Sequence, residues 1–259
     1  MNTSNMGMLS PQEAKILDAV AQGQALFDPT TFVAVGENSQ GQVDTPYQSW
    51  RFGYYLLDSL VGQEILWSIA YAPDPFGNRS CVIIVVNHLS VPLTMSDLQI
   101  YAGEQWTGPS GPDMDLLTGF LSSSVANTVP AGDKEGHAGY AVWSLVNAEM
   151  NGAVNAGLSF KADPANFPSG MSLGVLLWND TLQSICLLAS DDATTAKNNA
   201  YNSSGSGNRT ASVSPNNTVN GQSISVNINA SIRGLEDPNL ELSWLVVVSV
   251  TAPNALPFA

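Results

Sequence analysis

Few side chains in this sequence have the types and spacing needed for acid–base or metal chemistry. There are two histidines, His88 and His137, and no His-x-x-His or Cys-x-x-Cys pair that would hold zinc. We expect no nucleophile elbow, which is a Gly-x-Ser-x-Gly turn between a strand and a helix. A triad of serine, histidine and aspartate assembled from distant positions stays open. The sequence therefore predicts a protein that is not an enzyme, with no catalytic residue, no metal ligand and no cofactor.

Neighbouring carboxylates are the remaining candidates for binding chemistry. Asp113 and Asp115 form one pair, Asp191 and Asp192 form another, and each pair could hold calcium together with backbone carbonyls. Neither pair has the spacing of an EF-hand loop. We expect both pairs to be solvated acids in turns.

The charge balance excludes several classes of partner. The 259 residues include 22 acidic and 8 basic residues, which gives a net charge of -14. A protein that binds nucleic acid needs a cluster of lysine and arginine to displace phosphate counterions, so nucleic acid is not an expected partner. Anionic lipid headgroups repel an acidic protein. Any membrane that it engages is therefore expected to be zwitterionic, glycan-coated or receptor-bearing, and added salt should not weaken the attachment.

The clearest predicted element is an amphipathic helix over residues 10–27. Ser10 and Glu13 form a capping box, Pro11 suits the first helical position, and an Asp-Pro pair follows at 28–29. The apolar face of this helix includes Ile16, Leu17, Val20, Leu26 and Phe27. No apolar stretch in the sequence approaches the roughly twenty residues of a membrane-spanning helix.

From about Phe32 onward, short runs of β-branched and aromatic residues alternate with turn residues, which is typical of strands. The runs lie at 31–35, 50–57, 65–71, 81–87, 99–101, 139–146, 153–160, 172–178, 184–188, 224–232 and 240–250. They predict a mainly β protein, an antiparallel β-sandwich with an amino-terminal amphipathic helix. We expect one structural unit made of a helical segment (1–30), an insert packed on the body (31–80) and a sandwich domain (81–259).

Two long polar stretches lie at 107–124 and 193–222, and the second is predicted to be an exposed loop between strands from Asn202 onward. The cysteines Cys81 and Cys186 lie in apolar, strand-like runs, so we expect both in the core. A disulfide between them stays open, because spacing alone does not decide it.

Strands in the middle of the chain follow the order of a known superfamily. An apolar strand ends in asparagine, a Pro-x-Gly turn follows, a Gly-Ala-Val strand leads into a glycine-containing hairpin arm, and a Tyr-Asn segment comes later. The matching segments are 82–87, 98–104, 129–134, 152–160, 169–177, 201–204 and 240–250. Over about residues 81–250, the chain resembles the actinoporin-like pore-forming toxins, a superfamily that includes fungal fruit-body lectins.

The resemblance implies a sandwich flanked by helices that binds a membrane headgroup, self-associates there and inserts its amino-terminal helix as a pore. It implies a headgroup site at Trp178, Asn179, Asp180 and Tyr201, and a pore-forming role for the apolar face of the 10–27 helix. The family's phosphocholine pocket contains a serine, a proline and tyrosines that residues 177–181 lack, so phosphocholine specificity is not carried over. The protein is expected to be made soluble without a standard signal peptide, then released or secreted to act at target-cell membranes.

Two other functions fit the same sequence. A glycan-binding module on this scaffold would read sugars through neutral polar loops and stacking rings. The stacking candidates, which could equally be core residues, are Trp106, Trp143, Trp178 and Trp244. A self-assembling structural protein would also suit the low charge density.

Overall fold

The computed structural model describes residues 8–9, 11–23, 79–89, 93–102, 104–107, 125–126, 138–147, 153–162, 170–178, 182–203, 207–219, 222–234 and 243–251. The predicted strands at 31–35, 50–57 and 65–71 lie outside these residues, as does most of the predicted 31–80 insert.

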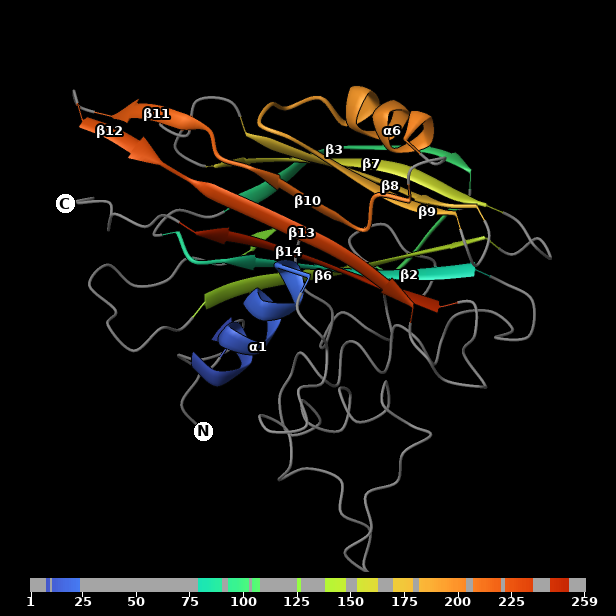
Figure 1. Cartoon of the computed structure of the whole chain (residues 1–259), viewed down its shortest axis with the longest axis horizontal. Coiled ribbons are helices and arrows are strands. Elements are labelled where there is room, and N and C mark those ends of the chain that lie inside the picture. Colours follow the sequence, from blue (N-terminus) through green and yellow to red (C-terminus); the bar gives the residue numbers. More distant parts are fainter. Residues whose placement is uncertain are drawn as a thin grey trace, which may run out of the picture.

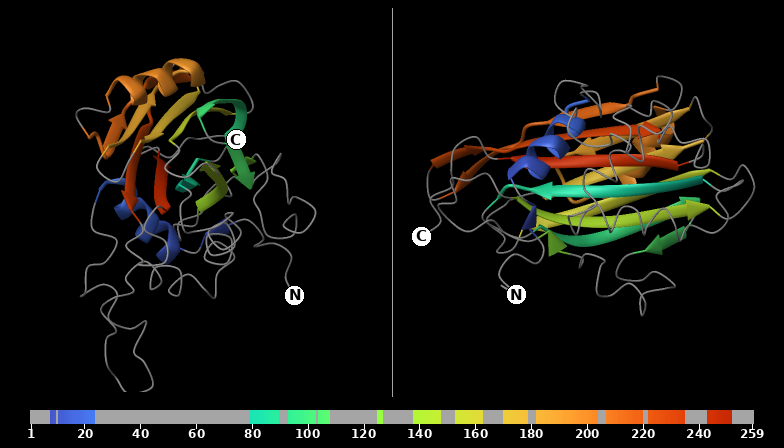
Figure 2. Two further views of the ribbon diagram at one scale, coloured as in Figure 1. Left: turned by 90° about the vertical axis from the view of Figure 1, so that its right-hand side faces the viewer. Right: turned by 90° about the horizontal axis from the view of Figure 1, so that it is seen from below.

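Two β-sheets stacked face to face form the body of the protein, and a helix lies on each outer face (Figures 1 and 2). The seven-stranded sheet has the order β1 (Met8–Leu9), β6 (Ala138–Asn147), β2 (Arg79–Asn87), β14 (Ser243–Thr251), β13 (Asn227–Gly234) and β10 (Thr210–Val213), and β4 (Glu104–Thr107) also pairs with β6. The five-stranded sheet has the order β5 (Val125–Ala126), β3 (Leu93–Ala102), β7 (Val154–Ala162), β8 (Met171–Leu177) and β9 (Gln183–Leu188). A separate ribbon pairs β11 (Asn216–Val219) with β12 (Gln222–Ser225). The predicted mainly β sandwich is confirmed.

The central strands are apolar along their length because both of their faces are covered. In β2, Ile83 and Val85 lie in the core between the two sheets, while Ile84 and Val86 lie beneath the helix α1 (Pro11–Ala21). A strand with one wet face would instead alternate between apolar and polar residues. The continuous apolar runs of the sequence therefore mark strands buried on both faces.

One strand pair departs from the predicted antiparallel arrangement. β14 runs parallel to β2, with Trp244 opposite Cys81 and Val250 opposite Asn87, whereas the other described pairs are antiparallel. Parallel neighbours need a long connection, and here most of the sandwich lies between the two strands in sequence.

The amino-terminal helix is shorter than the sequence predicts. α1 ends at Ala21, and Gly23 adopts a φ of 79°, the left-handed conformation that commonly follows the last helical turn. The Gly23 N–H donates to the carbonyl of Val20 at 2.8 Å. The predicted continuation of the helix to residue 27 is therefore wrong, and Leu26 and Phe27 themselves lie outside the described residues.

A second helix, at a position that the sequence did not predict, covers the five-stranded sheet (Figure 1). This helix, α6 (Ala193–Asn202), occupies the start of the polar 193–222 stretch. The strands β10 and β11 follow it, where an exposed loop was expected. The predicted 224–232 strand is divided at Val226 between β12 and β13.

Candidate functional site

The exposed large hydrophobic side chains of the described residues gather at one end of the five-stranded sheet. Tyr101 lies near the end of β3 and Trp178 directly follows β8, and both strand ends meet beside Asn155 of β7. Tyr201 lies in the last turn of α6, which covers this part of the sheet. The exposed side chains are Ile100 (37% exposed), Tyr101 (75%), Trp178 (49%) and Tyr201 (45%).

Three of these side chains and one lysine form two contacting pairs, and α6 contributes one residue to each pair. The rings of Trp178 and Tyr201 meet edge to face, with centroids 6.3 Å apart and planes at 70°. Lys197 lies one helical turn before Tyr201, and its Nζ is 6.0 Å from the ring centroid of Tyr101, within the range of a cation–π contact. We call Tyr101, Trp178, Tyr201 and Lys197 the aromatic patch.

The aromatic patch contains part of the headgroup site that the sequence analysis predicted. Trp178 and Tyr201 come together, whereas Asn179 and Asp180 lie outside the described residues. Tyr101 and Lys197 were missed, because neither lies in a motif and only the packing of α6 across the sheet unites them.

Only one of the four predicted stacking tryptophans is known to be exposed. Trp244 is 2% exposed and belongs to the core, while Trp178 is available to a ligand. The side chains of Trp106 and Trp143 are not among those described.

The aromatic patch depends on how α6 is seated. Gly157 and Gly174 face each other across β7 and β8 directly beneath the helix. A Cβ on Gly157 would lie 1.9 Å from the carbonyl oxygen of Ala193, and a Cβ on Gly174 would lie 1.9 Å from that of Ala196. Ala193, Ala196 and Ala200 are the buried residues of α6. The helix backbone therefore rests almost directly on the sheet backbone.

The acids Asp191 and Asp192 fasten the loop that enters α6. Asp191 pairs with Lys161 Nζ at 2.5 Å and accepts a hydrogen bond from Ser96 Oγ at 2.6 Å. Asp192 caps the helix, accepting from the N–H of Thr195 at 2.8 Å and from its hydroxyl at 2.6 Å, and these bonds hold the pKa of Asp192 below its usual value. No group of three potential metal ligands occurs in the part of the chain that the structure covers.

One Gly-x-Ser-x-Gly sequence does occur, at residues 170–174, although no nucleophile elbow was expected. Its serine, Ser172, is fully buried within β8 and not on a turn between a strand and a helix. The Ser172 hydroxyl donates to the carbonyl of Ser190 at 2.6 Å, accepts from the Asp192 N–H at 2.7 Å and contacts Ser159 Oγ at 2.7 Å. None of these partners is a histidine, so this serine has a structural role beneath α6.

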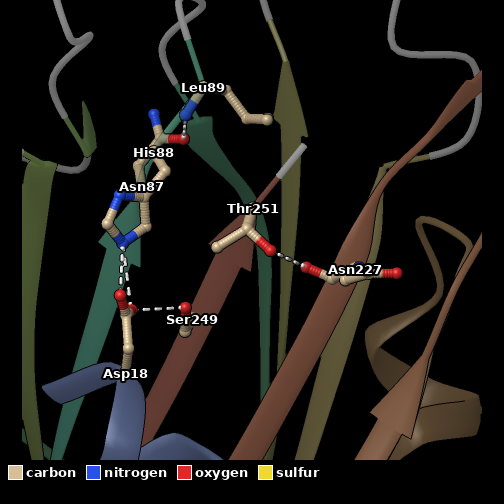
Figure 3. Close-up of polar contacts among 7 residues, drawn as sticks. All are labelled: Asp18, Asn87, His88, Leu89, Asn227, Ser249 and Thr251. Carbon is tan, nitrogen blue, oxygen red and sulfur yellow. Dashed lines mark hydrogen bonds and ion pairs between the residues drawn. The ribbon is translucent and has the colours of Figure 1, made fainter. Parts of the chain in front are cut away.

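A serine, a histidine and an aspartate meet where α1 contacts the sheet (Figure 3). His88 Nε2 lies 2.9 Å from both carboxylate oxygens of Asp18, and Ser249 Oγ donates to Asp18 Oδ1 at 2.7 Å. The aspartate lies between the other two residues, whereas a catalytic triad needs the histidine in that place. These contacts fasten α1 to the sheet, and a hydrogen bond from Ser231 Oγ to the carbonyl of Val20 adds to them.

The predicted pore-forming face of α1 is turned toward the protein. Ile16, Leu17 and Val20 are 7%, 0% and 2% exposed. They pack in a cluster with the sheet residues Ile84, Val86, Ala138, Tyr140, Leu245 and Val247. Among the described residues, no helix is long and apolar enough to cross a membrane.

The two cysteines do not form a disulfide. Cys81 lies in the core between the sheets, where burial raises the pKa of its thiol. Cys186 is only partly buried on β9, opposite Gly174. The expected core location therefore holds fully for Cys81 alone.

Comparison with known proteins gives similarity to solved structures. No protein-family model matches the chain, and no curated protein matches it. Among solved structures, the chain is similar to that of the lipid binding protein Nakanori, with 11% sequence identity and a TM-score of 0.44 over 86% of this chain and 96% of that chain. Identity at this level leaves the function of the chain to be inferred from its own residues.

Proposed function

We propose that this protein attaches to the surface of lipid membranes through the aromatic patch. The observation that carries the proposal is the gathering of exposed rings at one end of the sheet, where Tyr101, Trp178 and Tyr201 are each at least 45% exposed. A cluster of exposed apolar side chains generally marks an interaction surface. Tyrosine and tryptophan combine an apolar ring with a polar edge, which suits the boundary between lipid headgroups and acyl chains.

Burial of the rings supplies the attraction, because the net charge of -14 gives none toward anionic lipids. A half-exposed tryptophan or tyrosine leaves roughly 100 Å² of ring surface to be covered, worth about 2 kcal/mol. We therefore expect attachment to zwitterionic vesicles that is insensitive to moderate salt.

Vesicle co-sedimentation with phosphatidylcholine tests the proposal. Replacing Trp178 and Tyr201 with alanine together should weaken binding at least tenfold, because two rings lose their contact with the bilayer. Ile100→Ala is the matched control, because it removes an exposed apolar side chain at the same end of the sheet. Ile100 pairs with Ala156, which lies in the core between the sheets, so Ile100 is on the opposite face from α6 and its replacement should not weaken binding. Equal binding of the double variant and the unchanged protein would refute attachment through the aromatic patch. Binding of the unchanged protein to a glycan array but to no vesicle would favour the glycan-binding function instead.

Permeabilisation of the bilayer by several associated copies is the second step of the proposal, and it would use α1. Release of α1 would free the apolar side chains of Ile16, Leu17 and Val20 for insertion, together with the sheet surface that they now cover. An eleven-residue helix is about 16 Å long, roughly half of the hydrocarbon core of a bilayer. Insertion would therefore need a helix that extends beyond Ala21.

A reversible crosslink between α1 and the sheet tests this second step. The Asp18 and Ser249 side chains are in hydrogen-bond contact, so the double variant Asp18→Cys with Ser249→Cys places two thiols close together. The oxidised variant should bind vesicles without releasing an entrapped dye, and reduction should restore release. Dye release by the oxidised protein would exclude α1 from the mechanism, while leaving attachment through the aromatic patch intact.

A further inference from the structure

We infer that Lys197 and Tyr101 form a subsite for a phosphate oxygen of a membrane lipid, so that the aromatic patch selects phospholipids over lipids that lack phosphate. This inference rests on the proposed attachment to membranes and names the lipid class that the patch recognises.

The ammonium group of Lys197 has no carboxylate partner among the described residues. Lys161, at the other end of the same sheet, is neutralised by Asp191 at 2.5 Å. The one acid of β3, Asp97, accepts two hydrogen bonds of 3.0 Å from Gln99 Nε2. Helix α6 itself contains no acidic residue. The neighbour of Lys197 is instead the ring of Tyr101, which attracts the cation and leaves its three N–H donors unassigned.

The backbone of Lys197 is anchored to the sheet. Its carbonyl accepts a hydrogen bond from Asn155 Nδ2 at 3.4 Å, and the residue is partly buried. The glycine beneath it lets the helix approach so closely that a Cβ on Gly157 would lie 3.0 Å from Lys197 Cβ. The side chain of Lys197 therefore extends from an anchored backbone toward the ring of Tyr101.

This arrangement suits an anionic group at a defined depth in a bilayer. The rings of the aromatic patch favour the boundary below the headgroups, and the lipid phosphates lie just above that boundary. A lysine recognises phosphate as a compact positive charge. Partial exclusion of water by the surrounding rings and lipid strengthens the attraction. On a protein of charge -14, Lys197 supplies this attraction locally, without a basic surface.

Two vesicle compositions with the same acyl chains separate the contributions of the rings and the lysine. One is phosphatidylcholine, and the other is a galactosyl diacylglycerol that lacks phosphate. Lys197→Gln should weaken binding to phosphatidylcholine about fivefold and leave binding to the galactolipid unchanged. Tyr101→Leu removes both a ring of the aromatic patch and the partner of the cation, so it should weaken binding to both vesicles and more strongly to phosphatidylcholine. Lys15→Gln, which removes an exposed lysine from α1, is the control for net charge and should change neither.

The results distinguish failure of the subsite from failure of the proposed function. Equal losses on both vesicles, or no loss with Lys197→Gln, would refute the phosphate subsite while the Trp178 and Tyr201 variants still report on attachment. Inorganic phosphate at matched ionic strength separates the two possible sources of the anion. Vesicle binding that persists in its presence supports a lipid phosphate, whereas full competition by millimolar inorganic phosphate would overturn the lipid assignment.

Discussion

Replacing Gly174 with alanine tests how α6 is seated and whether the aromatic patch depends on that seat. A Cβ at this position would lie 1.9 Å from the carbonyl oxygen of Ala196 and 2.3 Å from its carbonyl carbon, which are backbone atoms that cannot rotate away. Ordinary contact begins at 3.4 Å, so α6 would have to lift from the sheet by about 1.5 Å. The lift would loosen the packing of the small buried face of the helix and break the bond from Asn155 Nδ2 to the carbonyl of Lys197.

Overpacking of a tight interface typically costs about 1–3 kcal/mol, and we expect the upper end for Gly174→Ala because backbone meets backbone. Urea unfolding followed by circular dichroism measures the change in the free energy of unfolding. Gly207→Ala is the control for backbone strain without a clash: a Cβ there meets nothing within 4 Å, and the left-handed φ of 58° alone should cost about 1–2 kcal/mol. Binding to phosphatidylcholine vesicles should fall together with stability, because Tyr201 moves with the helix. If the free energy of unfolding of Gly174→Ala lies within about 0.5 kcal/mol of that of the unchanged protein, the close packing of the α6 backbone on Gly174 is refuted.

Three further predictions concern the acids and thiols of the fold. Asp18→Ala should lower the free energy of unfolding by about 2 kcal/mol, because His88 and Ser249 lose the carboxylate that both of them contact. An unchanged urea midpoint would show that α1 is held on the sheet by apolar contacts alone. The lowered pKa of Asp192 means that its cap stabilises the fold above about pH 4 and that this stabilisation is lost as the pH falls through the pKa of the folded state. Asp192→Asn should therefore reduce the loss of thermal stability between about pH 5 and pH 2, and identical acid-unfolding curves would contradict the cap. Burial raises the pKa of both thiols, but Cys81 is fully buried and Cys186 only partly, so a disulfide reagent should modify Cys186 first and reach Cys81 only after unfolding; rapid modification of both thiols in the native protein would place Cys81 outside the core.

Strands that bury both faces could be predicted from the sequence, because a run such as Ile83 to Val86 is apolar at every position, short and β-branched, which favours a strand over a buried helix. The helix α6 could not be predicted in the same way. Its buried face consists of Ala193, Ala196 and Ala200, which are too small to stand out among polar neighbours. The signal that identifies the helix lies instead in Gly157 and Gly174, whose missing side chains make room for it from two other strands.

The candidate site was predictable only to the extent that single residues carry a signal. Trp178 and Tyr201 could be found through the resemblance to a known superfamily, and the structure brings their rings into contact. Tyr101 and Lys197 belong to a strand and a helix whose proximity depends on sheet order, so no local pattern joins them. The end of the 10–27 helix was misplaced because the left-handed Gly23 stops the helix before the Asp-Pro pair is reached.

The parallel pairing of β2 and β14 governs the order in which the protein can be assembled during synthesis. β2 occupies the interior of the seven-stranded sheet, and one of its two neighbours exists only after residues 243–251 have left the ribosome. Until then, one hydrogen-bonding edge of β2 stays open and the side chains of Ile83 and Ile84 lack part of their cover. Pairing between such distant segments is slow and exposes apolar edges to aggregation. The seven-stranded sheet can therefore be completed only after its last described strand has been released.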